Sequence, residues 1–500
     1  MGRWSPSVSS PVISDPIWSA SPILDAVENY RGSIIDLDAG RVISADEFAR
    51  AREALVAAFR QQGLAPGDRV LVTIGNGPLF PATLAALLAC EASPLLVHVM
   101  TPSAELARYS KRFGVKWLVG FGGDPQVQTV LTSCQQLEPL AGWSLTWGAF
   151  PEPSVIPGPE LRGVPLHPTS GSTGLPKIAL RPGFAAMEEA RHYAETMAIC
   201  EDDCLFAIPP MSHAYGYGLT VMTPLLSGAS VVTTANFSIK KLAEVLRDYP
   251  VTVLPMVPAH IDMLLFGGAI DFGRLRWLLT AGSMMPRRSA VQFRKKTGVT
   301  VCPLYGTTET GGISVATTAD GEDVDGRVGP PMNGVKVCVR PPADADEQGL
   351  EPGVGKLHIQ NSSMMAGYLD DHGSILHPWD QDGWFETGDL ARIANDGVIH
   401  LRGRTGEMIN VLGLKVVPCE VEEAIAAMPG VREVKVYGSR LASQAEIVKA
   451  AVAVEAGVDE QSIRAYCEEH LVYYKRPQAI ALVDALPRSP AGKIVRDRLP

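Results

Sequence analysis

The chain has 500 residues, more than a single hydrophobic core normally serves, so we expect two or more domains. Hydrophobic residues make up 46% and charged residues 20%, which is an ordinary globular mixture. The formal net charge is −10, and no stretch forms the basic stripe that nucleic-acid binding requires. The longest apolar run, residues 80–90, is too short to span a bilayer. We therefore expect neither a nucleic-acid partner nor a membrane partner.

Cysteine usage and the N-terminal sequence favour a cytoplasmic protein. The eight cysteines are scattered, and the closest pair, Cys200 and Cys204, lacks the two-residue spacing typical of zinc sites. Free, reduced thiols are the simpler interpretation. The first residues contain no apolar signal core, and Pro6 stands where a myristoylation signal needs Ser or Thr.

The first part of the chain alternates between helical and strand patterns. Residues 41–64 predict a helix with Phe48, Ala51, Leu55 and Phe59 on one face, followed by a strand at 70–74. A buried helix over 79–90 and a strand over 94–99 come next. The alternation returns with strands at 230–233, 251–254 and 275–279 and a helix at 239–248. This order predicts an α/β fold.

The pattern changes near residue 325. Short β-prone runs at 336–339, 356–360, 390–393 and 398–401 predict a β-rich subdomain over about 325–402. After residue 403 we predict helices at 417–428 and 462–471 and strands at 431–437 and 447–454. We therefore expect a large N-terminal domain over 1–402 and a small α+β domain over 403–500, which carries 13 basic and 13 acidic residues.

The strongest local motif runs from residue 169 to residue 177. It contains two glycines that let the backbone approach an anion, four hydroxyl side chains and a lysine. These features suit a phosphate-binding loop, although a Walker loop is excluded because Gly-Lys-Ser/Thr is absent. A flexible, hydroxyl-rich linker is the competing interpretation. The residues concerned are Thr169, Ser170, Gly171, Ser172, Thr173, Gly174 and Lys177.

Further motifs contain carboxylates beside glycine and threonine. The run Tyr305, Gly306, Thr307, Thr308, Glu309 follows an apolar stretch, and its carboxylate and hydroxyls suit Mg²⁺ and phosphate together. Asp389 follows a glycine turn, from which its carboxylate can accept both hydroxyls of a ribose. Either segment alone is equally compatible with an ordinary capped turn.

The order of these motifs, with Gly403-Arg404 and the terminal Pro490-Ala491-Gly492-Lys493, resembles the adenylate-forming superfamily. That superfamily includes acyl-CoA synthetases, adenylation domains of peptide synthetases and luciferases. The resemblance covers the chain from about residue 40 and implies ATP and Mg²⁺ as cofactors. The resemblance implies that residues 169–177 form the phosphate loop and that Gly282 and Tyr305 contact the adenine. It implies that Thr308 contacts a phosphate and that Glu309 binds the metal. Asp389, with Arg404, would bind the ribose. The resemblance also implies that Lys493 contacts the substrate carboxylate and the α-phosphate.

The resemblance further implies a C-terminal domain that rotates between two half-reactions. Its hinge falls at Gly406, where relatives usually carry Asp or Lys, and glycine tolerates the required backbone change. Asn410 stands where a lysine is common, ahead of the Gly413–Lys415 loop that would meet the acceptor. These departures leave the two conformations less firmly defined.

The acyl pocket is predicted around residues 210–218. His213 corresponds to the aromatic gate of the family, although a buried core histidine is the simpler alternative. The absence of any acidic residue between 205 and 239 favours an uncharged acid over an amino acid. We expect Gly216, Gly218 and Gly282 to leave space for a flat ring and Tyr215 and Tyr217 to stack on it.

The sequence thus predicts ATP-dependent activation of a small carboxylic acid, aryl or heteroaryl rather than fatty, to an acyl-adenylate. Transfer to CoA is the first hypothesis, with Lys415, Arg432, Lys435 and Arg440 as candidate phosphate contacts. An amide synthetase that uses an amine, and a ligase that loads a carrier protein, are the alternatives. A nucleotide-binding protein without turnover is disfavoured because Glu309, Asp389 and Lys493 are all present.

Overall fold

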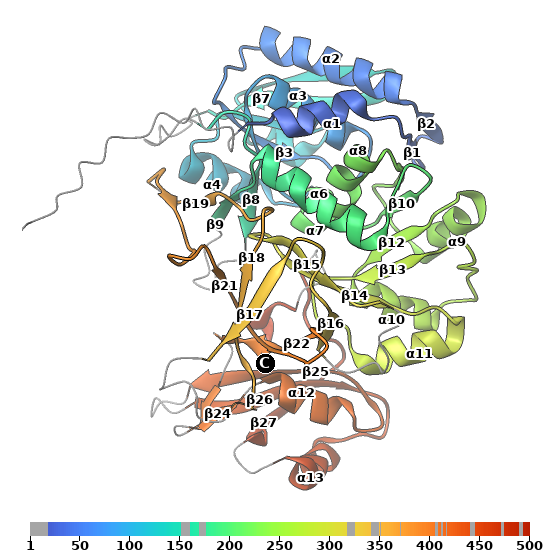
Figure 1. Ribbon diagram of the computed structural model, residues 1–500, viewed down its shortest axis with the longest axis vertical. Coiled ribbons are helices and arrows are strands. Elements are labelled where there is room, and N and C mark those ends of the chain that lie inside the picture. The colour runs from blue at the N-terminus through green and yellow to red at the C-terminus, as the bar shows by residue number, and fades with distance from the viewer. Residues whose placement is uncertain are drawn as a thin grey trace, which may run out of the picture.

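The computed structural model describes residues 19–151, 161–169, 177–317, 326–341, 350, 352–370, 372–405, 409–411, 414–416, 418–440, 446–471, 475–489 and 494–500. They form a large α/β body with a small domain below it, drawn in red in Figure 1. The body contains a mixed sheet and a mainly parallel sheet, with helices between them and outside them, and an antiparallel sheet that faces the small domain. The predicted fold class is therefore confirmed.

The first sheet belongs mainly to the N-terminal part of the chain. Its neighbouring strands pair in the order β20-β19-β9-β8-β4-β3-β5-β7-β6. The strands are β20 (Ile375–Leu376), β19 (Gly367–Leu369), β9 (Lys177–Leu180), β8 (Leu166–Thr169), β4 (Ser93–Leu96), β3 (Arg69–Thr73), β5 (Trp117–Phe121), β7 (Trp143–Ala149) and β6 (Ser133–Leu140). The chain returns to this sheet after residue 366, and this return brings β19 beside β9.

The second sheet carries the other half of the body. Its order is β15-β14-β13-β12-β10-β11-β1-β2, parallel from β14 to β1 and antiparallel at both edges. The strands are β15 (Gly311–Val315), β14 (Cys302–Thr307), β13 (Trp277–Thr280), β12 (Val253–Met256), β10 (Cys204–Ala207), β11 (Ser230–Thr233), β1 (Ile34–Asp36) and β2 (Arg41–Ile43).

Helices cover both faces of these sheets. One core lies between the sheets and combines residues such as Val70 and Val72 of β3 with the helices α1, α2, α3, α6 and α8. Leu71 points to the opposite face and packs with α4, as the period of two along a strand requires. The helices are α1 (Ser21–Asn29), α2 (Ala45–Gln61), α3 (Leu79–Ala89), α4 (Ser103–Phe113), α5 (Pro125–Gln128), α6 (Gly183–Met197), α7 (Ala214–Gly216), α8 (Thr223–Ser227), α9 (Ile239–Asp248), α10 (Pro258–Phe266) and α11 (Arg287–Thr297), with a π-helical segment at Tyr217–Met222.

The predicted helix at 41–64 is confirmed in its core face and corrected at both ends, since α2 spans Ala45–Gln61. Phe48, Ala51, Leu55 and Phe59 are the buried residues of α2. Residues 41–43 are instead strand β2, because Ser44 and Glu47 form a capping box that starts the helix at Ala45. The buried helix predicted over 79–90 is α3, whose residues 79–88 are all buried.

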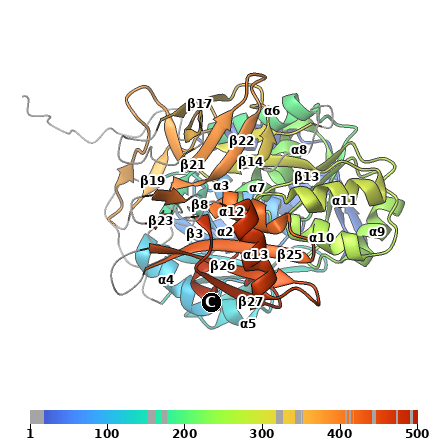
Figure 2. The same cartoon turned by 90° about the horizontal axis from the view of Figure 1, so that it is seen from below.

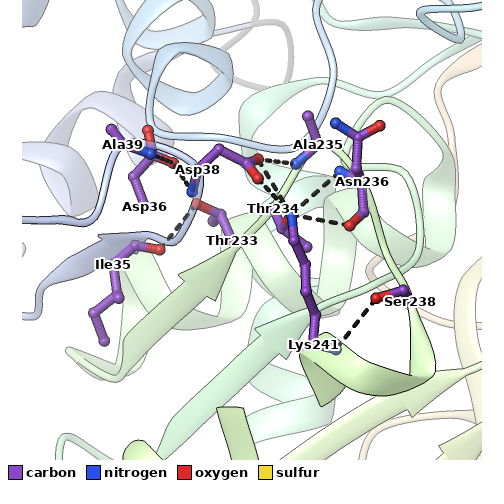
Figure 3. Close-up of polar contacts among 10 residues, drawn as sticks. All are labelled: Ile35, Asp36, Asp38, Ala39, Thr233, Thr234, Ala235, Asn236, Ser238 and Lys241. Atoms are coloured by element: carbon purple, nitrogen blue, oxygen red, sulfur yellow. Dashed lines mark hydrogen bonds and ion pairs between the residues drawn. The ribbon is translucent and has the colours of Figure 1, made fainter. Parts of the chain in front are cut away.

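A polar network ties the β1–β2 turn to the second sheet (Figure 3). Asp38 accepts hydrogen bonds from the Lys241 Nζ atom and the Ala235 amide, both at 2.6 Å, and from the Thr234 hydroxyl at 3.0 Å. Burial alone would raise the pKa of Asp38, but these hydrogen bonds outweigh it and lower that pKa. The network therefore joins the β1–β2 turn to the segment 234–241, about 200 residues further along the chain.

The third sheet is antiparallel, in the order β16-β22-β21-β18-β17. Its strands are β16 (Arg327–Gly329), β22 (Ile399–Arg404), β21 (Phe385–Ile393), β18 (Gly355–Gln360) and β17 (Lys336–Arg340). They contain three of the predicted β-prone runs in full and residues 399–401 of the fourth. The sheet shares a hydrophobic core with β14 and β15 of the second sheet, so it lies against the edge that carries the Tyr305 motif.

The small domain follows immediately. It contains β23 (Ile409–Val411), β24 (Leu414–Val416), α12 (Pro418–Ala426), β25 (Val431–Arg440), β26 (Glu446–Val454), α13 (Glu460–His470), β27 (Ala479–Val483) and a 3₁₀ turn at Arg496–Arg498. Figure 2 shows this domain from below, in front of the large body. The predicted helices and strands of this region are present, while the exact domain boundaries remain predictions. Within the described residues, no helix has the length and apolar character needed to cross a bilayer.

Candidate active site

The candidate site begins at the hairpin of β14 and β15. Tyr305 lies near the end of β14, is 8% exposed, and donates a 2.6 Å hydrogen bond to the Oδ2 atom of Asp389. Burial, followed by the charge of Asp389, raises the pKa of Tyr305 well above its ordinary value, so the phenol stays protonated. A β-bulge between Tyr305 and Gly306 turns the chain here.

Asp389 connects this hairpin to the third sheet. It lies on β21, opposite Arg404 on β22, and the Arg404 Nε atom donates to its Oδ1 atom at 2.8 Å. The side chain of Asp389 is 9% exposed, whereas that of Arg404 is 52% exposed. Each carboxylate oxygen can accept more than one hydrogen bond, so Asp389 retains capacity for ribose hydroxyls. The structure therefore brings together Tyr305, Asp389 and Arg404, as the resemblance implied.

The turn after β14 is held through its main-chain carbonyls. The carbonyl of Thr308 accepts the Arg181 Nη1 atom at 2.7 Å. The carbonyl of Glu309 accepts the Met365 amide at 2.7 Å, and that of Thr310 accepts the Ser363 hydroxyl at 2.7 Å. Three consecutive carbonyls are thus fixed by donors from other parts of the chain.

The side-chain hydroxyls of Thr307 and Thr308 differ in their hydrogen bonds. Thr307 Oγ1 lies 3.0 Å from Thr310 Oγ1 and also accepts the Thr310 amide, so it is used within the turn. The carbonyl of Thr308 is fixed while its partly exposed side chain makes no hydrogen bond with the residues that the structure describes. Thr308 is therefore the better placed of the two to contact a phosphate.

Arg181 also forms a buried ion pair that the sequence did not reveal. Its Nη2 atom lies 2.7 Å from Oε2 of Glu189, and the two side chains are 1% and 2% exposed. Burial raises the pKa of Glu189, an effect that the charge of Arg181 opposes. The sequence signal was weak, since an arginine four residues after the phosphate loop has no distinctive spacing. The pair links β9 and α6 to the turn that carries Glu309.

Lys177 and Glu309 approach a common residue, Tyr368 on β19. The Tyr368 hydroxyl donates to Glu309 Oε1 at 2.7 Å, and the Lys177 Nζ atom lies 5.1 Å from the centre of its ring. Tyr368 was also missed from the sequence, because a lone tyrosine in a β-prone run has no functional signature.

The phosphate loop is described only at its two ends. Thr169 and Lys177 occupy paired positions of the antiparallel strands β8 and β9. The predicted residues Ser170, Gly171, Ser172, Thr173 and Gly174 lie outside the described residues, as do Gly406 and Lys493.

The donor set fits a magnesium ion bound together with a nucleotide. Glu309 is partly exposed, and its Oε2 atom has no hydrogen-bond partner within the described residues. No group of three or more His, Cys, Asp or Glu side chains that could hold a metal occurs among them. Mg²⁺ characteristically uses one or two carboxylates plus phosphates and water, so a single carboxylate suits it.

The acyl pocket is corrected in three places. A Cβ atom on Gly216 would lie 2.2 Å from the Pro210 carbonyl oxygen, and one on Gly218 would lie 2.5 Å from Glu189. Both glycines therefore permit close packing and leave no space for a ring. Tyr217 is 1% exposed, with its ring 4.6 Å from that of His167, so it is unavailable for stacking.

For His213 and Gly282, the roles in the acyl pocket stay predictions. A Cβ on Gly282 would meet only Val257, at 3.8 Å, so this glycine borders open space. His213 is partly buried and caps α7 with its side chain. Burial lowers the pKa of His260, in the helix after Val257, to about 4, so this neighbour is neutral at pH 7. Glu189 does approach this region, but its charge faces Arg181.

Two of the basic residues proposed to contact CoA are engaged within the small domain. Arg432 donates to the Val454 and Asp484 carbonyls. Lys435 lies 2.9 Å from Glu422, and both side chains are about four-fifths buried. Both side chains thus make contacts within the small domain, and their role toward CoA stays a prediction. The side chains of Lys415 and Arg440 lie outside the described residues.

These contacts bring together residues of the motifs that resemble the adenylate-forming superfamily. The family model for AMP-binding enzyme matches residues 25–369, and the model for AMP-binding enzyme C-terminal domain matches residues 420–493. The chain therefore belongs to the AMP-binding enzyme family, and the predicted superfamily is confirmed.

Characterised relatives in this family are named as CoA ligases. A methyl-dioxo-octahydro-indenyl-propanoyl:CoA ligase of Rhodococcus jostii is 30% identical over 66% of this chain, and the match spans 63% of that relative's length. Sulfoacetate–CoA ligase of Cupriavidus necator is 27% identical over 93% of this chain and 94% of its own. The solved structure of the amide bond synthetase McbA from Marinactinospora thermotolerans superposes with a TM-score of 0.80 at 23% identity, covering 96% of this chain and 98% of that one. This last likeness shows the fold alone.

Proposed function

We propose that this protein activates a small carboxylic acid with ATP, forming an acyl-adenylate and pyrophosphate, and then transfers the acyl group to CoA. The observation that carries the proposal is the convergence of Tyr305, Asp389 and Arg404 beside the turn of Glu309. The CoA ligases among its relatives support the same chemistry.

Reduced thiols support a cytoplasmic location, since all eight cysteines, which the structure describes in full, are free.

We expect the nucleotide to lie where β14 of the second sheet, which carries Tyr305, meets β21 of the third sheet, which carries Asp389. The Asp389 carboxylate accepts the ribose hydroxyls, with Arg404 fixing its orientation, and Tyr305 lies at the adenine. Lys177 and Thr308 contact the phosphates. This arrangement holds the α-phosphate in place before the acid arrives, which is the main contribution a protein makes to phosphoryl-type transfer.

The first reaction forms one bond and breaks one. A carboxylate oxygen attacks the α-phosphorus, and the bond to the leaving pyrophosphate breaks. Negative charge that builds on the phosphate oxygens is stabilised by Lys493, whose positive charge also draws the two anions together. A magnesium ion held by Glu309 would neutralise charge on the phosphates when bound. In the second reaction the acceptor displaces AMP from the acyl carbon.

We propose a neutral monocarboxylic acid as substrate, in a pocket bordered by His213 and Gly282. An aryl or heteroaryl acid remains our preferred class, on the narrower ground that Gly282 leaves open space. Transfer to an amine is the second candidate, because Arg432 and Lys435 are engaged elsewhere and an amine acceptor needs no phosphate contacts. Loading of a carrier protein is a third outcome.

The decisive experiment is ATP–pyrophosphate exchange with a panel of carboxylic acids and Mg²⁺. We expect exchange with neutral acids to exceed exchange with α-amino acids, and we expect Glu309→Gln to abolish most of it. Mass spectrometry of the products then compares CoA with amines at equal concentration. Exchange without any thioester, but with a stable amide, would overturn the CoA step and leave the activation step intact.

A further inference from the structure

Tyr368 contacts both a phosphate-loop residue, Lys177, and the carboxylate assigned to the metal, that of Glu309. It belongs to β19, and its main chain pairs with Ala179 of β9, the strand that begins at Lys177. Its hydroxyl bonds to Glu309 Oε1 at 2.7 Å, and its ring lies under the Lys177 ammonium at 5.1 Å. Two residues about 130 positions apart are thus joined through a third.

The main chain around Glu309 is held independently of this tyrosine. The Met365 amide and the Ser363 hydroxyl bind the carbonyls of Glu309 and Thr310, and Arg181 binds that of Thr308. The hydroxyl of Tyr368 therefore does little to place the turn. What it controls is the direction of the Glu309 carboxylate, since it occupies one oxygen and leaves Oε2 for another ligand.

Each contact of Tyr368 restricts the position of a charged side chain. The Tyr368 hydroxyl is the donor and the Glu309 carboxylate is the acceptor of a short hydrogen bond. An acceptor-only carboxylate bound by such a donor cannot rotate freely. On the other side, the ring face attracts the lysine ammonium and restricts where it lies.

We propose that Tyr368 is a positioning residue that orients Glu309 toward the metal and Lys177 toward the phosphates, so that metal binding and phosphate binding are organised by one side chain. The inference rests on the proposed function, because the ATP and metal are those of the activation step. It assigns Tyr368 no contact with the reacting atoms.

The test separates the hydroxyl from the ring. Tyr368→Phe keeps the ring under Lys177 and removes only the bond to Glu309, so it should weaken metal binding about tenfold, as loss of an outer-shell partner typically does. Tyr368→Leu also removes the ring and should weaken ATP binding by a further two- to fivefold, the usual size of an exposed cation–π contact. Both effects should appear as higher half-saturation concentrations.

The readout is binding without turnover. Isothermal titration with ATP at a series of Mg²⁺ concentrations, without any acid, gives both affinities, and Mn²⁺ paramagnetic resonance with ATP present gives the metal affinity directly. Tyr109→Phe is the matched control, because Tyr109 is a buried tyrosine that packs in the same hydrophobic cluster as Leu369 of β19. It should leave both affinities unchanged.

Glu309→Gln separates failure of the inference from failure of the proposed function. If Glu309→Gln weakens metal binding and Tyr368→Phe does not, the positioning role is refuted while the site assignment stands. If Glu309→Gln itself leaves metal and ATP binding unchanged, the proposed site is refuted. Equal weakening by Tyr368→Phe and Tyr109→Phe would show general destabilisation and also overturn the positioning role.

Discussion

Replacing Arg181 by methionine should destabilise the large domain much more than loss of a surface ion pair. The Nη2 atom of Arg181 lies 2.7 Å from Oε2 of Glu189, with side chains only 1% and 2% exposed. Removing one partner of such a pair leaves an uncompensated buried charge, which costs about 3–5 kcal/mol. The carbonyl of Thr308 also loses its donor, so the active-site turn is affected directly.

A double-mutant cycle tests this explanation. Glu189→Gln should be similarly destabilising, because it leaves Arg181 charged and unpaired. The combination of Arg181→Met with Glu189→Gln removes both charges and should cost less than the sum, with a coupling of about 2 kcal/mol. Urea unfolding followed by tryptophan fluorescence measures each variant. Arg247→Met is the control, because Arg247 pairs with Asp248 in full solvent and its loss should leave the midpoint unchanged.

The loss of stability caused by Arg181→Met should also depend on pH. Burial raises the pKa of Glu189, and Arg181→Met removes the charge that opposes this effect. In the folded variant, Glu189 then binds a proton more readily than it does in the unfolded chain. The free energy of unfolding therefore falls as the pH rises above the unfolded pKa of glutamate, about 4.3. The fall ends once the pH has passed the raised pKa of Glu189 in the folded state. The cost should therefore be smaller at pH 5 than at pH 7.5, by up to about 1.4 kcal/mol per pH unit. Additive costs, or a cost that does not grow with pH, would refute the reasoning.

Three further predictions concern catalysis and stability. Lys493→Ala should reduce adenylation on the order of 10²-fold but spare transfer from supplied acyl-adenylate, and equal loss in both half-reactions would contradict its role. Gly406→Pro should leave pyrophosphate exchange intact while thioester or amide formation fails, because proline fixes φ at the hinge; full rates in both would place the hinge elsewhere. Asp38→Asn should lower thermal stability by about 1 kcal/mol at pH 7. Folding lowers the pKa of Asp38, so the stability difference between the two proteins should be present above the unfolded pKa of about 3.9. It should vanish as the pH falls through the pKa of Asp38 in the folded state. A stability difference that persists at lower pH would exclude the ion pair as its cause.

Local sequence patterns alone predicted much of the fold. Strand 230–233 and helix 239–248 agree with β11 and α9 at every residue. Their signals are local, since a β-branched run between turns and an apolar period of 3.6 do not depend on distant contacts. The start of α2 was wrong because the preceding residues 41–43 pair with β1, a choice that depends on a partner strand elsewhere in the chain.

The same distinction applies to the site. Tyr305, Asp389 and Arg404 were predictable, because each lies in a short motif whose order along the chain is typical of the family. Tyr368 and the ion pair of Arg181 with Glu189 were not, because neither has a local pattern.

Only the tertiary structure decided where these side chains act. The return of the chain from the third sheet to the first places β19 beside β9, and that pairing brings Tyr368 to Glu309 and Lys177. It also showed that Gly216 and Gly218 are packed against the Pro210 carbonyl and Glu189. A glycine in sequence signals only a missing side chain. Whether that absence leaves room for a ligand or for another part of the protein depends on what lies within about 4 Å, and for both residues the protein itself fills the space.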